Sequence, residues 1–130
     1  MSRTEPQLLS DALPHMGYIE RYADMDLAED VVVDAIALRL SSMLDVLARL
    51  PEESLEEMFG AAWPAMRGLR NRIAHGYHLV DLGVLRVTVA QELPLVREAV
   101  EARLQRLDAT LDVDLGWISA GSTEDLGPIR

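Results

Sequence analysis

Apolar residues recur at every third or fourth position through residues 26–50, which is the spacing of one face of a helix. The positions on that face are Val32, Ile36, Leu40, Met43, Leu44, Leu47 and Leu50. The opposite side is polar and includes Asp34, Ser41, Ser42 and Asp45. Pro51 is expected to end this helix because proline lacks an amide hydrogen and clashes with the preceding turn. The pattern predicts an amphipathic helix that covers a core.

Proline and glycine divide the next part of the chain into two shorter helices. The first is predicted within residues 51–60, which begin with proline and end with glycine. The second begins at Trp63-Pro64 and ends at Gly76. One more helix is predicted near the N-terminus, starting after Pro14.

A further helical stretch covers about residues 81–107, with a kink or break predicted at Pro94. The segment LRVTVA, residues 85–90, is the one candidate β-strand, and its context is helical. Residues 111–130 contain glycine and proline with little periodicity, so a flexible or partner-ordered tail is expected there. The sequence therefore predicts an all-α domain over residues 1–110, an antiparallel bundle of four or five helices, followed by the tail.

Composition and charge narrow the classes of function. The 130 residues carry a net charge of −10, which argues against non-specific binding of nucleic acid. Cysteine is absent, so a disulfide framework and a thiolate metal site are excluded. The N-terminus has no secretion-signal pattern, and no stretch is apolar enough to span a membrane. The protein is therefore expected to be cytoplasmic, with no membrane partner and no metal site.

Arginine alone supplies the basic residues, and three arginines gather in one acid-free segment. Residues 61–80 contain Arg67, Arg70 and Arg72 and no acidic residue. A locally positive patch on a negative protein fits the binding of one phosphate group better than general binding of duplexes. The same segment contains the stretch RNRIAHGY, in which arginine is followed by four residues, histidine, one residue and tyrosine.

This spacing brings together residue types that suit phosphate chemistry. His75 is a candidate for proton transfer because imidazole exchanges protons near neutral pH. Arg70 offers a planar, permanently charged fork to phosphate oxygens, and Asn71 can orient the histidine or the phosphate. Arg67 and Arg72 are further candidates for phosphate contacts. Taken alone, such a motif also fits a surface array of ion pairs.

Helix geometry separates the members of the motif. On a straight helix Tyr77 lies within roughly 20° of Arg70, whereas His75 lies about 140° away. The three side chains therefore cannot share one narrow face. Either the helix loosens near Gly76 or the site depends on a second subunit, and the spacing leaves both possibilities open.

The motif and its surroundings resemble the HEPN superfamily and, within it, the HepT-like toxins of toxin–antitoxin pairs. The resemblance covers about residues 15–107. It includes AAWPAMRGLRNRIAHGYHLVD, where a Trp-Pro element precedes the arginine–histidine–tyrosine signature and an aspartate follows, and it includes the Leu-Pro pair at 93–94. The family usually carries a Gly-Glu-Ala segment in its second helix, whereas this chain reads RLSSMLDVLARL there.

The resemblance implies a HEPN-like homodimer that acts as a metal-independent endo- or exoribonuclease toxin. Arg70 and His75 would be its catalytic residues, RNA its substrate, and no cofactor would be needed. It also implies a cognate minimal nucleotidyltransferase antitoxin that transfers AMP to Tyr77. The added nucleotide would place negative charge near Arg70 and compete with RNA phosphate.

Two alternatives come from other classes of function. In the first, the chain is a non-catalytic HEPN helper module that binds nucleotide or docks a nucleotidyltransferase. In the second, it is a structural bundle whose motif has lost its function. Substitution of Arg70 or His75 by alanine separates an enzyme from a docking module, because only an enzyme toxin loses its toxicity while its dimer persists.

Overall fold

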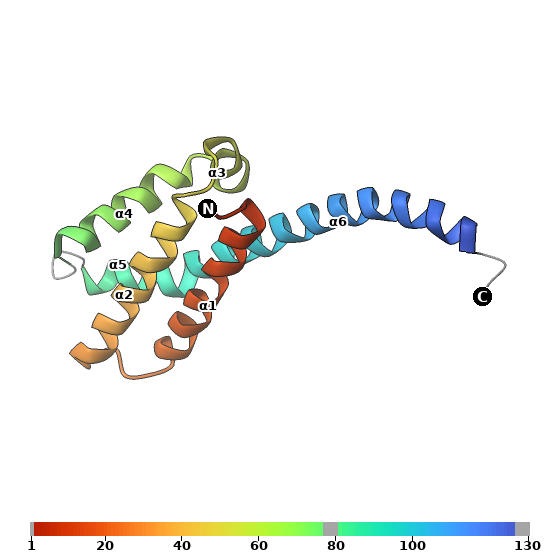
Figure 1. Cartoon of the computed structure of the whole chain (residues 1–130). Coiled ribbons are helices and arrows are strands. Elements are labelled where there is room, and N and C mark those ends of the chain that lie inside the picture. Colours follow the sequence, from red (N-terminus) through yellow and green to blue (C-terminus); the bar gives the residue numbers. More distant parts are fainter. Residues whose placement is uncertain (1, 77–80, 127–130) are drawn as a thin grey trace.

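The computed structural model describes residues 2–76 and 81–126, and side-chain surroundings as far as residue 109. Every element in those ranges is helical, so the predicted all-α fold is confirmed (Figure 1). The elements in chain order are α1 (Glu5–Ala23), α2 (Asp30–Leu47), α3 (Glu52–Phe59), α4 (Ala62–Gly76), α5 (Leu82–Val87), the π-helical segment η2 (Thr88–Glu92) and α6 (Leu93–Leu126).

The first helix begins earlier than predicted. Thr4 caps it: the Thr4 hydroxyl accepts from the Gln7 amide at 3.3 Å, and the Gln7 side chain accepts from the Thr4 amide at 2.8 Å. Leu8 and Leu9 in the next turn are buried. This reciprocal cap and the buried leucines offset the hydrogen bond that Pro14 removes inside the helix. The predicted start after Pro14 is therefore wrong.

The apolar face predicted within residues 26–50 forms the centre of the core. Its residues from Ile36 to Leu47 are at most 2 % exposed, and α1 packs along them. Helices α4 and α6 add buried side chains to the core, namely Trp63, Leu69, Ile73, Leu93, Val96 and Val100, and α3 and α5 add Leu55 and Leu85. Burial of such side chains is the main favourable term in folding. The helical pattern thus fixes which side of α4 faces the core.

The irregularity predicted near Pro94 is a π-helical segment. The amide of Leu93 donates to the carbonyl of Thr88, five residues back. Pro94 lacks an amide hydrogen, and its ring would press on the carbonyl four residues earlier in an α-helix. The wider π turn relieves that crowding, as π-bulges in helices do. The candidate strand at residues 85–90 is helical here, as its context indicated.

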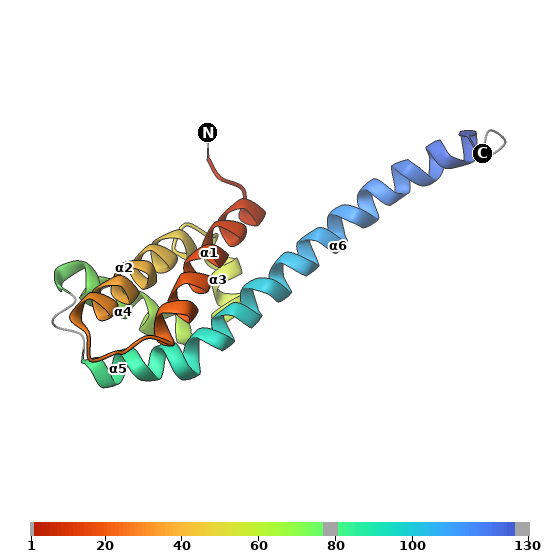
Figure 2. The ribbon, with the colours of Figure 1, turned by 90° about the horizontal axis from the view of Figure 1, so that it is seen from below.

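The final helix leaves the bundle and extends away from the other helices (Figures 1 and 2). Its contacts with α1 and α3 come from its first part, which includes Val96 and Val100. Partner-dependent ordering of residues 111–130 stays a prediction. In the part of the chain that the structure describes, no helix is long and apolar enough to cross a membrane.

Candidate active site on α4

Helix α4 presents the predicted site residues because its opposite side is held in the core. Trp63, Leu69 and Ile73 are buried, and they anchor the helix against α2 and its neighbours. The side chains of Arg67, Asn71, Arg72 and His75 are exposed. The locally positive stretch of the sequence is therefore an accessible surface rather than part of the core.

Arg70 lies at the edge between α4 and α2. Its Nε donates to the Oδ1 atom of Asp45 on α2 at 2.5 Å. Its Nη1 lies at 3.5 Å from the Oδ1 atom of Asn71, so this second contact is long. The Arg70 side chain remains 38 % exposed, which leaves its terminal nitrogens within reach of a ligand.

His75 lies in the last turn of α4 and faces solvent. The helix stays α-helical through His75 and ends at Gly76, whose φ of 143° suits glycine. Loosening of the helix therefore does not bring Arg70 and His75 onto one face. On a regular helix their directions differ by about 140°. Within one chain, the two predicted catalytic residues are neighbours along the helix but point in different directions.

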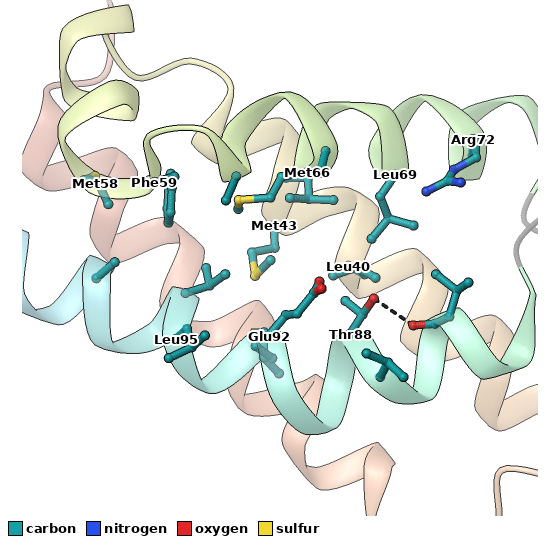
Figure 3. Close-up of a pocket in the computed structure, with 18 of the residues that line it drawn as sticks. Leu40, Met43, Met58, Phe59, Met66, Leu69, Arg72, Thr88, Glu92 and Leu95 are labelled. Atoms are coloured by element: carbon teal, nitrogen blue, oxygen red, sulfur yellow. Dashed lines mark hydrogen bonds between the residues drawn. The ribbon is translucent and has the colours of Figure 1, made fainter.

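Arg67 and Arg72 do not join Arg70 in one cluster. Arg72 lies about 200° around the helix from Arg70 and lines a groove on the far flank of α4. Figure 3 shows its guanidinium at one end of that groove, beyond Leu69. Arg67 is exposed and contributes nothing to the groove. The three arginines of the acid-free segment therefore lie on different sides of α4 and do not form one positive patch.

The groove itself is large and mostly apolar, and no sequence pattern predicted it. Its volume is about 940 Å³. It lies between α4 and the consecutive helical segments α5, η2 and the start of α6 (Figure 3). Three methionines line it, Met43, Met58 and Met66, together with Phe59. Methionine-rich apolar surfaces adapt to ligands of varied shape. The groove is therefore a second feature with binding potential, next to Arg72 but apart from the Arg70–Asp45 contact.

Residues 77–80 lie outside the described residues, and they include Tyr77, the predicted site of AMP transfer. Among the residues that the structure does describe, no group of three or more histidine, cysteine, aspartate or glutamate side chains is arranged to hold a metal ion. The polar side chains described at the candidate site are those of Arg70, Asn71, His75 and Asp45.

Comparison with known families shows the family of the chain. The family model described as Ribonuclease HepT-like matches residues 13–103, which include all of α4. The chain belongs to the HepT-like ribonuclease family. The matched HepT-like region ends within the first part of α6, at Arg103. No curated protein and no solved structure matches the chain.

Asp45 is the residue beside Arg70 that the sequence did not predict as part of the candidate site. Its position on the polar side of the helix was predicted correctly, but nothing linked it to Arg70, which lies 25 residues later. The signal that was available is weak, because Asp45 is one of several acidic side chains on exposed helix faces. Only the packing of α2 against α4 brings the carboxylate to the arginine.

Proposed function

We propose that this chain is a metal-independent ribonuclease toxin in which Arg70 and His75 act on the RNA phosphate. The observation that carries the proposal is that the Arg70 side chain is 38 % exposed and His75 faces solvent on α4, inside the segment matched by the HepT-like family model. We propose that the toxin acts in the cytoplasm, where its RNA substrate and the nucleotidyltransferase would both be present.

The reaction needs one base, one acid and donors for the charged transition state. The ribose 2′-oxygen attacks phosphorus, its proton passes to a base, and the bond from phosphorus to the 5′-oxygen breaks as an acid protonates that oxygen. His75 can perform either proton transfer. The terminal nitrogens of Arg70 donate to the phosphate oxygens, where negative charge grows. This route leaves a 2′,3′-cyclic phosphate and requires no metal.

A second copy of the chain supplies what one copy lacks. One chain offers a single histidine of this motif, and Arg70 and His75 point about 140° apart on a regular helix. We propose a homodimer whose cleft combines these residues from both copies. Exposed apolar side chains on α2 support a self-contact, since Val31 and Leu38 are 73 % and 65 % exposed.

Regulation is proposed at Tyr77, which follows Gly76 directly. A cognate minimal nucleotidyltransferase would transfer AMP from ATP to the tyrosine hydroxyl, with release of pyrophosphate. The new phosphodiester adds negative charge and bulk close in sequence to His75. It would compete with RNA phosphate for Arg70 and so silence the toxin.

The central experiment measures cleavage of RNA by the wild type, Arg70→Ala and His75→Ala, with EDTA present. We expect cleavage by the wild type and a loss of about 100-fold or more in each variant. Each variant should keep the wild-type dimer and thermal unfolding midpoint. Absence of wild-type cleavage on total cellular RNA, with the folded dimer confirmed, would sink the ribonuclease proposal.

The composite cleft has its own test, in which wild type and His75→Ala are co-expressed in equal amounts with different tags. If each cleft needs both copies intact, activity falls to roughly a quarter of the wild type because only wild-type dimers cleave. Independent sites would instead retain about half. The second result would contradict the shared cleft and leave the ribonuclease proposal in place.

The antitoxin proposal is tested by intact mass. The wild type and Tyr77→Phe are incubated with the cognate nucleotidyltransferase, ATP and Mg²⁺. We expect mass gains in steps of one AMP in the wild type alone, together with loss of RNA cleavage. No gain, with a transferase active on another substrate, would remove this regulation.

The groove favours a second candidate function, a non-catalytic helper that docks a nucleotidyltransferase. Its volume of about 940 Å³ and its methionine lining suit a partner segment better than a single phosphate group. In this alternative Met66→Asp abolishes transferase binding, whereas His75→Ala changes nothing. Binding measurements on both variants distinguish a docking module from a nuclease.

A further inference from the structure

The contact between Asp45 and Arg70 contributes little to the stability of the fold. The side chains are 49 % and 38 % exposed, and exposed ion pairs contribute about 0–1 kcal/mol. Yet this contact joins α2 to the predicted catalytic arginine on α4 at 2.5 Å. The effect of this contact that bears on the proposed reaction is the orientation it gives the guanidinium.

The way Asp45 binds Arg70 differs from the two-point contacts that Arg3 and Arg97 make with carboxylates. Arg3 uses Nε and Nη2 together, at 3.0 Å and 2.7 Å, to bind both oxygens of Asp11. Arg97 does the same with Glu20, at 2.7 Å for each contact. For Arg70, only Nε contacts the carboxylate, through one oxygen of Asp45.

This single contact leaves most N–H donors of the Arg70 guanidinium available. A guanidinium has five N–H donors, one on Nε and two on each terminal nitrogen. Asp45 occupies the Nε donor, and Asn71 takes one Nη1 donor through the long contact. Within the described part of the chain, no hydrogen bond involves Nη2. The terminal nitrogens can therefore bind two phosphate oxygens while Asp45 holds the guanidinium through Nε.

We propose that Asp45 is a positioning residue for Arg70 in RNA cleavage, an inference that rests on the proposed function. The carboxylate fixes the side chain through Nε and turns the terminal nitrogens toward the scissile phosphate. It does not contact the substrate itself. Because its negative charge also repels RNA phosphate, Asp45 weakens binding of the substrate slightly while it improves the geometry of the transition state.

These opposed effects predict a distinctive split between kcat and KM. In Asp45→Ala, kcat should fall by about 10–100-fold, since Arg70 loses its fixed orientation. KM should stay within about threefold of wild type or decrease, since a negative charge near the phosphate is gone. Asp45→Glu keeps a carboxylate on a longer arm and should restore most of kcat. A merely structural role would produce neither the split nor the rescue.

Asp11→Ala is the matched control. It removes an aspartate from another exposed arginine pair, with side chains 46 % and 40 % exposed, on α1 rather than beside the site. It should leave kcat, KM and the thermal unfolding midpoint unchanged. The comparison separates the loss of any surface ion pair from the loss of this one.

The decisive experiment measures steady-state cleavage of a fluorescent RNA by the wild type, Asp45→Ala, Asp45→Glu and Asp11→Ala. A fall of kcat in Asp45→Ala alone, with rescue by glutamate, supports the proposal. If the wild type cleaves RNA and Asp45→Ala matches it in kcat and KM, the positioning role is overturned and the ribonuclease proposal stands. If the wild type does not cleave RNA, both fall together.

Discussion

Two arginines in this molecule occupy opposite kinds of surroundings. Arg103 on α6 is 17 % exposed, and all three of its nitrogens have partners. Nε and Nη1 donate to Glu5 and Glu57 at 2.8 Å and 2.5 Å, and Nη2 donates to Ser54 at 3.2 Å. This cluster connects α6 to α1 and α3.

Arg70 has one carboxylate contact, through Nε, and its terminal nitrogens remain accessible. The difference follows from physical chemistry, because a half-buried guanidinium must find partners inside the protein to compensate for lost water. An exposed one can leave donors for a ligand. We infer that Arg103 serves the fold and Arg70 serves the reaction, and the following substitutions test that division.

The largest expected effect is on catalysis, in Arg70→Ala. RNA cleavage should fall by about 100–1000-fold, the usual loss when a donor to a charged transition state is removed. The thermal unfolding midpoint should change by less than about 3 °C, because the pair with Asp45 is exposed. Activity and calorimetry on the same sample check both statements. A large drop of the midpoint would place Arg70 with the structural arginines.

The next effect is on stability, in Arg103→Ala. The substitution leaves Glu5 and the buried Ser54 without their charged donor, at a cost of about 2 kcal/mol. The thermal unfolding midpoint should fall by roughly 5–10 °C. RNA cleavage per folded molecule should persist at low temperature. Unchanged stability combined with lost cleavage would reverse the roles given to the two arginines.

Most of the fold followed from the sequence because its signals are local. The apolar period of α2 and Gly76 at the end of α4 each act within a few residues, and both predictions are confirmed. The predicted end of the helix at Pro51 is late, because α2 ends at Leu47, four residues earlier. The predicted start of α1 is wrong because the cap at Thr4 and the buried leucines after it keep the chain helical through Pro14. That error shows that buried leucines and a good cap outweigh one lost hydrogen bond.

The sequence predicted only those features of the candidate site that lie within one helix. The spacing of Arg70 and His75 placed both on α4, and the angle between them followed from helix geometry. Asp45 could not be found, since its contact depends on how two helices pack. The partners of Arg103 lie 98 and 46 residues away in sequence, so they too depend on tertiary packing. The RNA, dimer and transferase partners stay predictions.

A smaller effect concerns pH and a histidine outside the site. Burial lowers the pKa of His15 from its ordinary 6.5, the charge of Arg39 lowers it further, and Asp11 opposes them. As pH falls through 6.5, the unfolded chain binds a proton that the folded chain does not. The free energy of unfolding should therefore fall until the folded pKa is reached, and then stay constant in this contribution.

His15→Gln tests this contribution through thermal unfolding at pH 7.5 and pH 5.5. The thermal unfolding midpoint should fall further between pH 7.5 and pH 5.5 in the wild type than in the variant, because only the wild type has His15. The variant should also show some decrease, because other titrating groups are present in both proteins. Equal losses would show that His15 titrates alike in the folded and unfolded chains. RNA cleavage should not differ between the two proteins at pH 7.5, since His15 lies on α1, apart from the site.

The smallest effect is expected from removal of residues 110–130. The ion pairs that Arg97 and Arg103 form, and the buried Leu93, Val96 and Val100, all lie in the part of α6 that would remain. The thermal unfolding midpoint should therefore change by less than about 2 °C, and RNA cleavage should persist. A reduced rate of AMP transfer in this variant alone would support partner-dependent ordering of the tail. Loss of the dimer would instead assign the projecting helix to self-association, and would move the subunit contact away from the exposed side of α2.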